Sequence, residues 1–260
     1  DSVKNVSAGF TKVLYENGLY LFAKWDYIFI SPPLTITQEQ IDEMVAGNRK
    51  VGLGVMGFAD LLFQLGISYN SDEALQTAEE VMGFIQEESH AASRHLAETR
   101  GVFKNYGKSV YRRRKNCRYR NATVTTIAPT GTLSIIAGCS SGIEPLFALS
   151  FVRNVMDNDK LLEVNPYFEE VANDQRFYSR ELMDEIAKRG SIKKFKQIPK
   201  DVRNVFVTAH DVSPEWHIRM QAAFKKYTDN AVSKTVNLPN DASVDDVMKV
   251  YNLAYELGCK

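Results

Sequence analysis

The chain has 260 residues, 44% of them hydrophobic and 25% charged, with a formal net charge of zero. This is ordinary globular composition, and charge neutrality gives no bulk electrostatic support for binding nucleic acid or a membrane surface. The sequence contains no apolar run of the roughly 18 residues that a transmembrane helix needs, and charged residues interrupt the aromatic-rich stretch 10–30, which excludes a secretory signal there. Three scattered cysteines argue against a disulfide-stapled secreted fold, so a cytoplasmic location is expected by default.

Capping signals and apolar periodicity predict the helices. Thr37 and Gln40 match a capping box, and Ser71 precedes a segment whose apolar residues recur with helical period until Gly101. Ser213 followed by a proline is typical of a helix start. Helices are therefore predicted at about 37–46, 71–100, 180–188, 213–224 and 243–257.

Runs rich in β-branched residues predict strands at 123–128, 147–155 and 234–238. Strands that alternate with helical stretches favour an α/β fold with crossover connections. Gly52, Gly54 and Gly57 punctuate the segment 48–62, and we expect them to allow close backbone approach before a buried helix.

The predicted strand at 123–128 runs directly into a loop of small and hydroxylated residues. Small side chains let backbone N–H groups approach an anion, and hydroxyl groups add further donors. The loop therefore predicts a phosphate cradle, with a turn that hydrogen-bonds its own backbone as the alternative. The residues concerned are Pro129, Thr130, Gly131, Thr132 and Ser134.

Residues 128–134 (APTGTLS) and 138–145 (GCSSGIEP) closely resemble the adenosylcobalamin-dependent (class II) ribonucleotide reductases. Segments 48–62, 209–224 and 228–239 resemble the same family, so the resemblance covers roughly residues 48–260. It implies the family's ten-stranded α/β barrel, with residues 35–260 as a partial catalytic barrel domain and 1–34 unassigned.

The resemblance also implies an activity and a site. The family reduces ribonucleoside diphosphates, or triphosphates, to 2′-deoxyribonucleotides for DNA synthesis. It uses a thiyl radical generated with adenosylcobalamin, and a thioredoxin- or glutaredoxin-type reductant. Carried over, the loop residues Pro129, Thr130, Gly131, Thr132 and Ser134 hold the substrate's phosphates. A homodimer is left open, and no membrane, DNA or RNA partner is expected.

One departure from the family pattern bears on catalysis. The family's radical cysteine lies in an Asn-Pro-Cys-x-Glu motif, which this sequence lacks, and Cys117, Cys139 and Cys259 do not have the flanking residues. No catalytic residue is therefore assigned. We expect the chain to be a partial piece of a reductase that is inactive alone. A fragment of a class I large subunit and an inert truncated or split fragment remain the alternatives.

Several other polar residues are ambiguous. Glu144 follows the cradle directly, where it could orient backbone amides or a substrate hydroxyl, or could be a buried carboxylate bonded to neighbouring backbone N–H groups. The basic run 112–115, with Arg118 and Arg120, could approach a phosphate or form a solvated loop.

The histidines and cysteines do not show metal-ligand spacing. His90 and His95 are five residues apart, and His210 and His217 span a predicted loop and helix. No metal site is therefore predicted. Cys139 is expected to be a small buried hydrophobe or a redox thiol.

Overall fold

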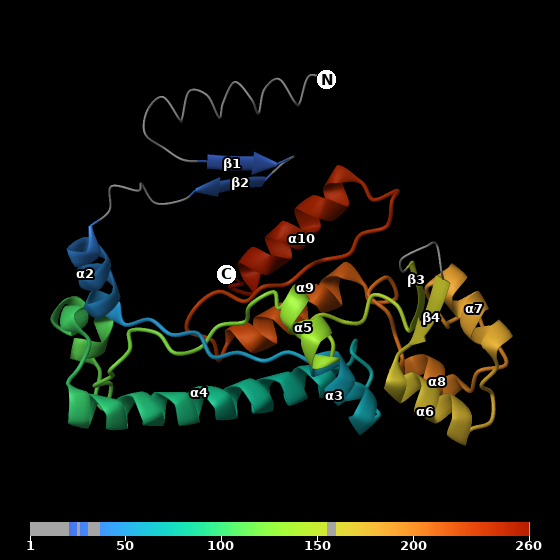
Figure 1. The fold of residues 1–260 in the computed structure, drawn as a ribbon, viewed down its shortest axis with the longest axis horizontal. Coiled ribbons are helices and arrows are strands. Elements are labelled where there is room, and N and C mark those ends of the chain that lie inside the picture. The colour runs from blue at the N-terminus through green and yellow to red at the C-terminus, as the bar shows by residue number, and fades with distance from the viewer. Residues whose placement is uncertain (1–20, 25–26, 31–36, 155–159, 260) are drawn as a thin grey trace.

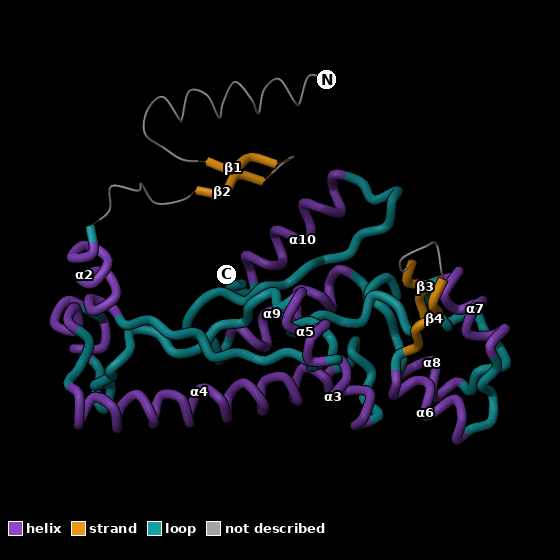
Figure 2. Tube along the Cα trace, viewed as in Figure 1, coloured by secondary structure: helices purple, strands orange, loops and turns teal. Residues whose placement is uncertain are grey.

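The computed structural model describes residues 21–24, 27–30, 37–154 and 160–259, and the arrangement of their helices and strands is shown in Figures 1 and 2. The helices are α2 (Gln38–Asn48), α3 (Phe58–Leu65), α4 (Asp72–Arg100), α5 (Gly131–Ala137), α6 (Pro166–Asp174), α7 (Arg180–Arg189), α8 (Lys200–Val205), α9 (Pro214–Lys225) and α10 (Val244–Glu256), with the 3-10 helices η1 (Lys104–Lys108) and η2 (Val110–Arg113). Two antiparallel hairpins are formed by β1 (Leu21–Lys24) with β2 (Tyr27–Ile30) and by β3 (Ser150–Asn154) with β4 (Lys160–Val164).

Helix α4 runs along one edge of the structure and carries much of its core (Figure 1). The Ser71 side chain caps it by accepting from the backbone of Ala74, and the helix ends before Gly101, as predicted. Ala74, Ala78 and Met82 lie four residues apart, so they share one face, and all three are fully buried. This face packs directly against α9 in the first hydrophobic cluster.

Three extended segments form the centre of the fold and run parallel to one another. Leu53 pairs with Thr125, and Ile127 pairs with Val232, as isolated bridges rather than a continuous sheet. The predicted strand at 123–128 is therefore the middle segment, although its ladder is interrupted. Gly54 is required at this place, because a Cβ atom there would lie 2.0 Å from the backbone oxygen of Thr126. The expectation of close backbone approach is confirmed.

The predicted strand at 234–238 is wrong, since these residues form no strand in the structure. The β-branched pattern is present, but the backbone N–H of Thr235 donates to the carboxylate of Glu144 instead of to a neighbouring strand. The predicted strand at 147–155 is shorter than expected: β3 spans Ser150–Asn154, and Val155 lies outside the described residues. The five predicted helices are all confirmed, as α2, α4, α7, α9 and α10.

A second hydrophobic cluster holds α6, α7 and α8 together with the region of the β3–β4 hairpin. Phe63, from α3, stacks on Phe206 at a centroid distance of 4.6 Å, and Phe168 packs against the same ring. Phe63 and Leu149 thereby connect this cluster to the central segments.

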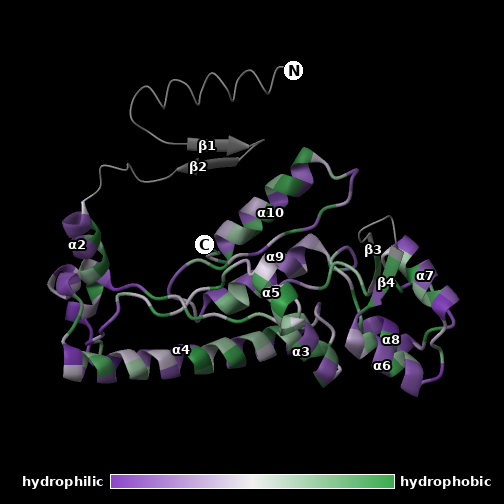
Figure 3. Ribbon diagram, in the orientation of Figure 1, coloured by the Kyte–Doolittle hydropathy of each residue, from purple (hydrophilic) through white to green (hydrophobic). Residues whose placement is uncertain are grey.

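Two helices leave apolar side chains exposed, as the hydropathy colouring of α5 and α10 in Figure 3 also indicates. Ile135 and Ile136 of α5 are 72% and 78% exposed, and Tyr251 and Tyr255 of α10 are 73% and 87% exposed. Among the described helices, none combines the length and apolar content needed to cross a membrane.

Candidate phosphate-binding site

The predicted cradle is a single tight turn between the middle extended segment and α5. Thr130 adopts the left-handed conformation (φ 54°, ψ 22°), which turns the chain sharply into the helix. Its Oγ1 accepts a hydrogen bond from the backbone N–H of Gly142 at 2.8 Å, and its carbonyl accepts from the N–H of Ser134. The turn is thus held by contacts that reach both into α5 and into the loop after it.

The turn presents donors that the protein itself does not use. In the described part of the chain, no carbonyl or side chain accepts from the N–H groups of Gly131, Thr132 and Leu133. The Thr132 side chain is exposed beside them, as is the ring of Pro129. Three adjacent N–H groups and a hydroxyl at an exposed turn suit an anion with several acceptor oxygens.

The other two hydroxyls of the predicted cradle bind their own backbone. Ser134 is only 4% exposed, and its hydroxyl donates to the carbonyl of Gly131 at 3.0 Å. Thr130 Oγ1 is occupied by Gly142, as described above. The structure therefore brings all five predicted residues into one turn, with Thr130 and Ser134 shaping it from inside.

A second loop, residues 139–144, supports the cradle from behind. The backbone N–H of Ser140 donates to the buried carboxylate of Asp60 at 2.5 Å, and Asp60 also accepts from the amide of Asn165. Ser141 donates through its hydroxyl to the carbonyl of Pro129 at 2.5 Å. Neither Asp60 nor Ser141 is predicted from the sequence pattern; the available signal is an acid within the apolar helix sequence FADLLF.

Glu144 lies at the end of this supporting loop and is partly buried, in an ion pair with a buried lysine side chain. Its Oε2 accepts from Lys234 Nζ at 2.5 Å, and its Oε1 accepts from the backbone N–H of Thr235 at 2.7 Å. Lys234 also contacts Nδ1 of His217, on α9. The carboxylate thus bonds to a backbone N–H that is distant in sequence, and the sequence pattern predicted neither Lys234 nor His217 as its companions.

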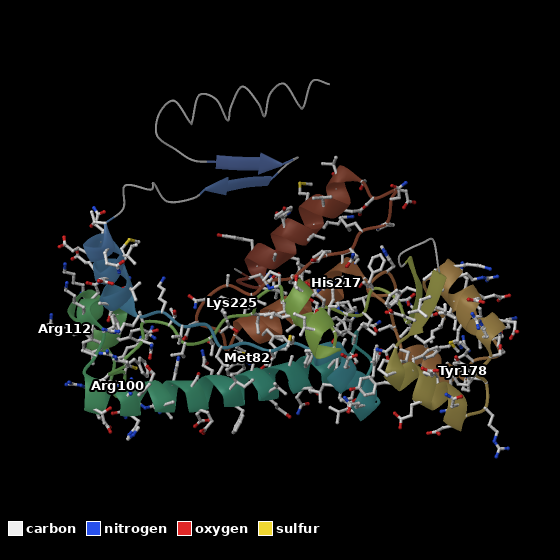
Figure 4. All side chains as sticks on the ribbon, viewed as in Figure 1. Met82, Arg100, Arg112, Tyr178, His217 and Lys225 are labelled. Carbon is white, nitrogen blue, oxygen red and sulfur yellow. The ribbon has the colours of Figure 1, made fainter. Side chains whose placement is uncertain are left out.

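The predicted basic run lies elsewhere. Figure 4 shows Arg112 and Arg100 at the end of the structure that carries α2, away from His217. Residues 112–115 are exposed, and Arg120 donates to the carbonyls of Arg100 and Gly101 at the end of α4. Tyr119, next to this run, is buried with its ring edge-to-face against Tyr111 at 5.1 Å.

The histidines and cysteines are separated from one another. His90 pairs with Asp229, exposed His95 pairs with Glu98, and His210 packs against Phe147. Among the described residues, no group of three or more His, Cys, Asp or Glu side chains is arranged to hold a metal ion. Cys139 is a free, partly buried thiol, and burial together with the Asp60 charge raises its pKa, which lowers the thiolate fraction.

Comparisons with known proteins match most of the chain. The ribonucleotide reductase barrel domain matches residues 34–118 and 115–260. The chain is 52% identical over 222 residues to the vitamin B12-dependent ribonucleoside-diphosphate reductase of Thermoplasma acidophilum, covering 85% of this chain and 29% of that protein. It is 48% identical over 221 residues to the enzyme of the same name from Mycobacterium tuberculosis, covering 85% of this chain and 32% of that protein.

A solved structure agrees as well. The class Id ribonucleotide reductase alpha subunit of Actinobacillus ureae superposes with a TM-score of 0.72 and 25% identity, over 84% of this chain and 39% of that one. The chain therefore belongs to the ribonucleotide reductase family, and its fold is part of the α/β barrel domain, as the sequence predicted. It spans 29% to 32% of the length of the two vitamin B12-dependent relatives.

Proposed function

We propose that this chain supplies the substrate phosphate cradle of a vitamin B12-dependent (class II) ribonucleotide reductase. The complete enzyme reduces ribonucleoside diphosphates, with triphosphates as the alternative, to the 2′-deoxyribonucleotides needed for DNA synthesis, and a thioredoxin- or glutaredoxin-type protein regenerates it in the cytoplasm. Sequence identity is the observation that supports class II. The chain is 52% and 48% identical to reductases named vitamin B12-dependent, against 25% to the class Id alpha subunit.

The cradle assignment is supported by the unused donors of the turn. The N–H groups of Gly131, Thr132 and Leu133 and the hydroxyl of Thr132 belong to three consecutive exposed residues at the first turn of α5. Phosphate oxygens accept hydrogen bonds from such donors, and these bonds contribute to binding the substrate rather than to the chemical step. Fixing the diphosphate would orient the ribose, and correct orientation lowers the barrier of a following radical step by several kcal/mol (about 7 or more in favourable cases).

No described residue is assigned to binding adenosylcobalamin. Both ring nitrogens of His217 are occupied, by the carbonyl of Ala209 and by Lys234, and Nε2 of His90 contacts Asp229. No step of this proposal therefore passes through the cofactor, and the role given to this chain is positioning of the substrate.

The test is substitution of the exposed hydroxyl in the complete reductase. Thr132→Val combined with Ser134→Ala is expected to raise the KM for cytidine diphosphate about tenfold, because one ligand contact and the internal brace of the turn are both lost. The affinity for adenosylcobalamin should stay unchanged. Thr99→Val is a matched control, since Thr99 is exposed on α4 and donates only to the carbonyl of Leu96. An unchanged KM in the double variant would contradict the assignment.

The class I alternative is tested by measuring whether turnover needs adenosylcobalamin or a separate protein subunit as the source of the radical. A class II enzyme turns over with adenosylcobalamin and needs no separate radical-carrying subunit. A requirement for such a subunit would assign the complete protein to class I, and the cradle would retain its role in substrate binding.

A further inference from the structure

Lys234 is a fully buried lysine that has no place in the phosphate cradle itself. Its side chain is 0% exposed, and its ammonium group contacts Glu144 Oε2 at 2.5 Å, His217 Nδ1 at 2.9 Å and the Thr235 carbonyl at 2.7 Å. An ammonium group has three N–H donors. All three donors are therefore satisfied inside the protein, and no site is left on this group for a ligand.

His217 enters the network as a neutral acceptor. Its Nε2 lies 3.2 Å from the carbonyl of Ala209, which can only accept, so Nε2 carries the proton and Nδ1 is free to accept from Lys234. Burial, and then the charge of Lys234, lower the pKa of His217 to about 4. The network therefore contains one cation, Lys234, and one anion, Glu144.

Stability alone does not explain such a pair. Removing two charges from water costs several kcal/mol per ion, and apolar residues of similar volume often stabilise a fold as well or better. The Glu144 side chain is 23% exposed, so the carboxylate reaches the surface while the Lys234 side chain does not. A rigid connection to that loop is the property that an apolar replacement would not supply.

The connection to the cradle can be followed bond by bond. The backbone N–H of Glu144 donates to the carbonyl of Ser141 at 2.9 Å, and the Ser141 hydroxyl donates to the carbonyl of Pro129 at 2.5 Å. Between them, the N–H of Gly142 donates to Thr130 Oγ1 at 2.8 Å. Thr130 has a left-handed backbone, which a non-glycine residue adopts only when its surroundings hold it there.

We propose that Lys234 is a positioning residue for the phosphate cradle: it fixes Glu144, and through the supporting loop it fixes the strained backbone of Thr130. This inference rests on the proposed function of the turn 129–134. Lys234 and Glu144 are 90 residues apart in the sequence. Their contact therefore connects the segment that follows α9 to the loop that supports the cradle.

The experiment uses the complete reductase and Lys234→Met, which keeps the length of the side chain but removes its three donors. The readouts are the KM and kcat for cytidine diphosphate and the competitive inhibition constant of inorganic pyrophosphate, which probes the cradle without the nucleoside. We expect both the KM and the inhibition constant to rise at least about tenfold, with kcat at saturation changed less than about threefold. Glu144→Gln, which keeps the shape and one acceptor oxygen, should raise the KM by a smaller factor.

A stability control separates positioning from folding. Met183→Ala removes a fully buried side chain of α7 in the second cluster and should lower the Tm while the KM stays within about twofold. The inference is wrong if Lys234→Met leaves the KM unchanged. It is also wrong if Lys234→Met raises the KM no more than Met183→Ala does at a similar loss of Tm. If Lys234→Met does not fold, Glu144→Gln decides by the same criteria.

Thr132→Val distinguishes this inference from the proposed function. A raised KM in Thr132→Val with an unchanged KM in Lys234→Met and Glu144→Gln leaves the cradle in place and refutes only the positioning role. An unchanged KM together with an unchanged pyrophosphate constant in the double variant Thr132→Val and Ser134→Ala, which also loses the internal brace of the turn, refutes the cradle itself.

Discussion

Gly54 is the position at which the smallest substitution should have the largest structural effect. A Cβ atom added there would lie 2.0 Å from the backbone oxygen of Thr126 and 3.1 Å from the carbonyl carbon. Normal contacts require more than 3 Å, so the segments around Leu53 and Thr126 would have to separate by at least about 1 Å. Because the obstacle is backbone, no change of rotamer can relieve it.

The cost follows from the hydrogen bonds at this point. The N–H of Leu53 donates to the carbonyl of Val124 at 2.7 Å, and the N–H of Thr126 donates to the carbonyl of Leu53 at 2.9 Å. Breaking these two backbone hydrogen bonds at about 0.5 to 1.5 kcal/mol each predicts a loss of about 1 to 3 kcal/mol. Gly54→Ala should therefore lower the Tm of the complete reductase, by fewer degrees per kcal/mol than in a small domain because the entropy of unfolding grows with chain length.

The assay is thermal unfolding followed by circular dichroism, with two comparisons. Gly107→Ala is the control, because nothing lies within 4 Å of its added Cβ atom, and it should change stability by less than about 1 kcal/mol. Gly52→Ala would bring its Cβ atom to 2.5 Å from Thr126 Cγ2, a side-chain atom that Thr126→Ser removes. Thr126→Ser should thus rescue Gly52→Ala but not Gly54→Ala. A wild-type Tm in Gly54→Ala, or its rescue by Thr126→Ser, would refute the reasoning.

Two further predictions concern acid stability and the isolated chain. Because the pKa of His217 is about 4 when folded and near 6.5 when unfolded, only the unfolded chain binds its proton between these values, and the free energy of unfolding should fall by up to about 3 kcal/mol as the pH drops from 6.5 to 4. His217→Gln should show a shallower Tm loss between pH 6.5 and 4.5, and an equal loss would contradict this. The isolated 260-residue chain should bind a hydrophobic dye through Ile135, Ile136 and Tyr251 and should form no deoxynucleotide, which a dye-binding titration and a turnover assay would check.

The helices could be predicted because their signals are local. Ser71 and Gly101 bound α4, and Ser243 forms a capping box with Asp246, just as the sequence indicates. Pairing between distant segments is different, since a strand pattern does not state its partner. Thr235 has the β-branched character of a strand, but its N–H bonds to a carboxylate 91 residues away, so the expected strand at 234–238 does not form.

The same distinction applies to the site. The turn 129–134 was recognisable because its five predicted residues are contiguous and resemble a family motif. Its supports come from three other places: Asp60 on α3, Lys234 after α9, and His217 on α9. A buried lysine and a buried aspartate look like ordinary surface residues in a sequence, and only the fold reveals that each is paired. The supporting residues therefore could not be assigned without the structure.

This arrangement has a consequence for how substrate binding responds to mutation. In the proposed cradle, the donors for the ligand are mainly backbone N–H groups of Gly131, Thr132 and Leu133, which no substitution of a side chain removes. Thr132 contributes one exposed hydroxyl in addition. Residues that hold the backbone in place control all of these donors together, because a shift of the turn misaligns every bond at once. Lys234→Met should therefore raise the KM for the substrate by a larger factor than Thr132→Val, although Lys234 contacts no ligand.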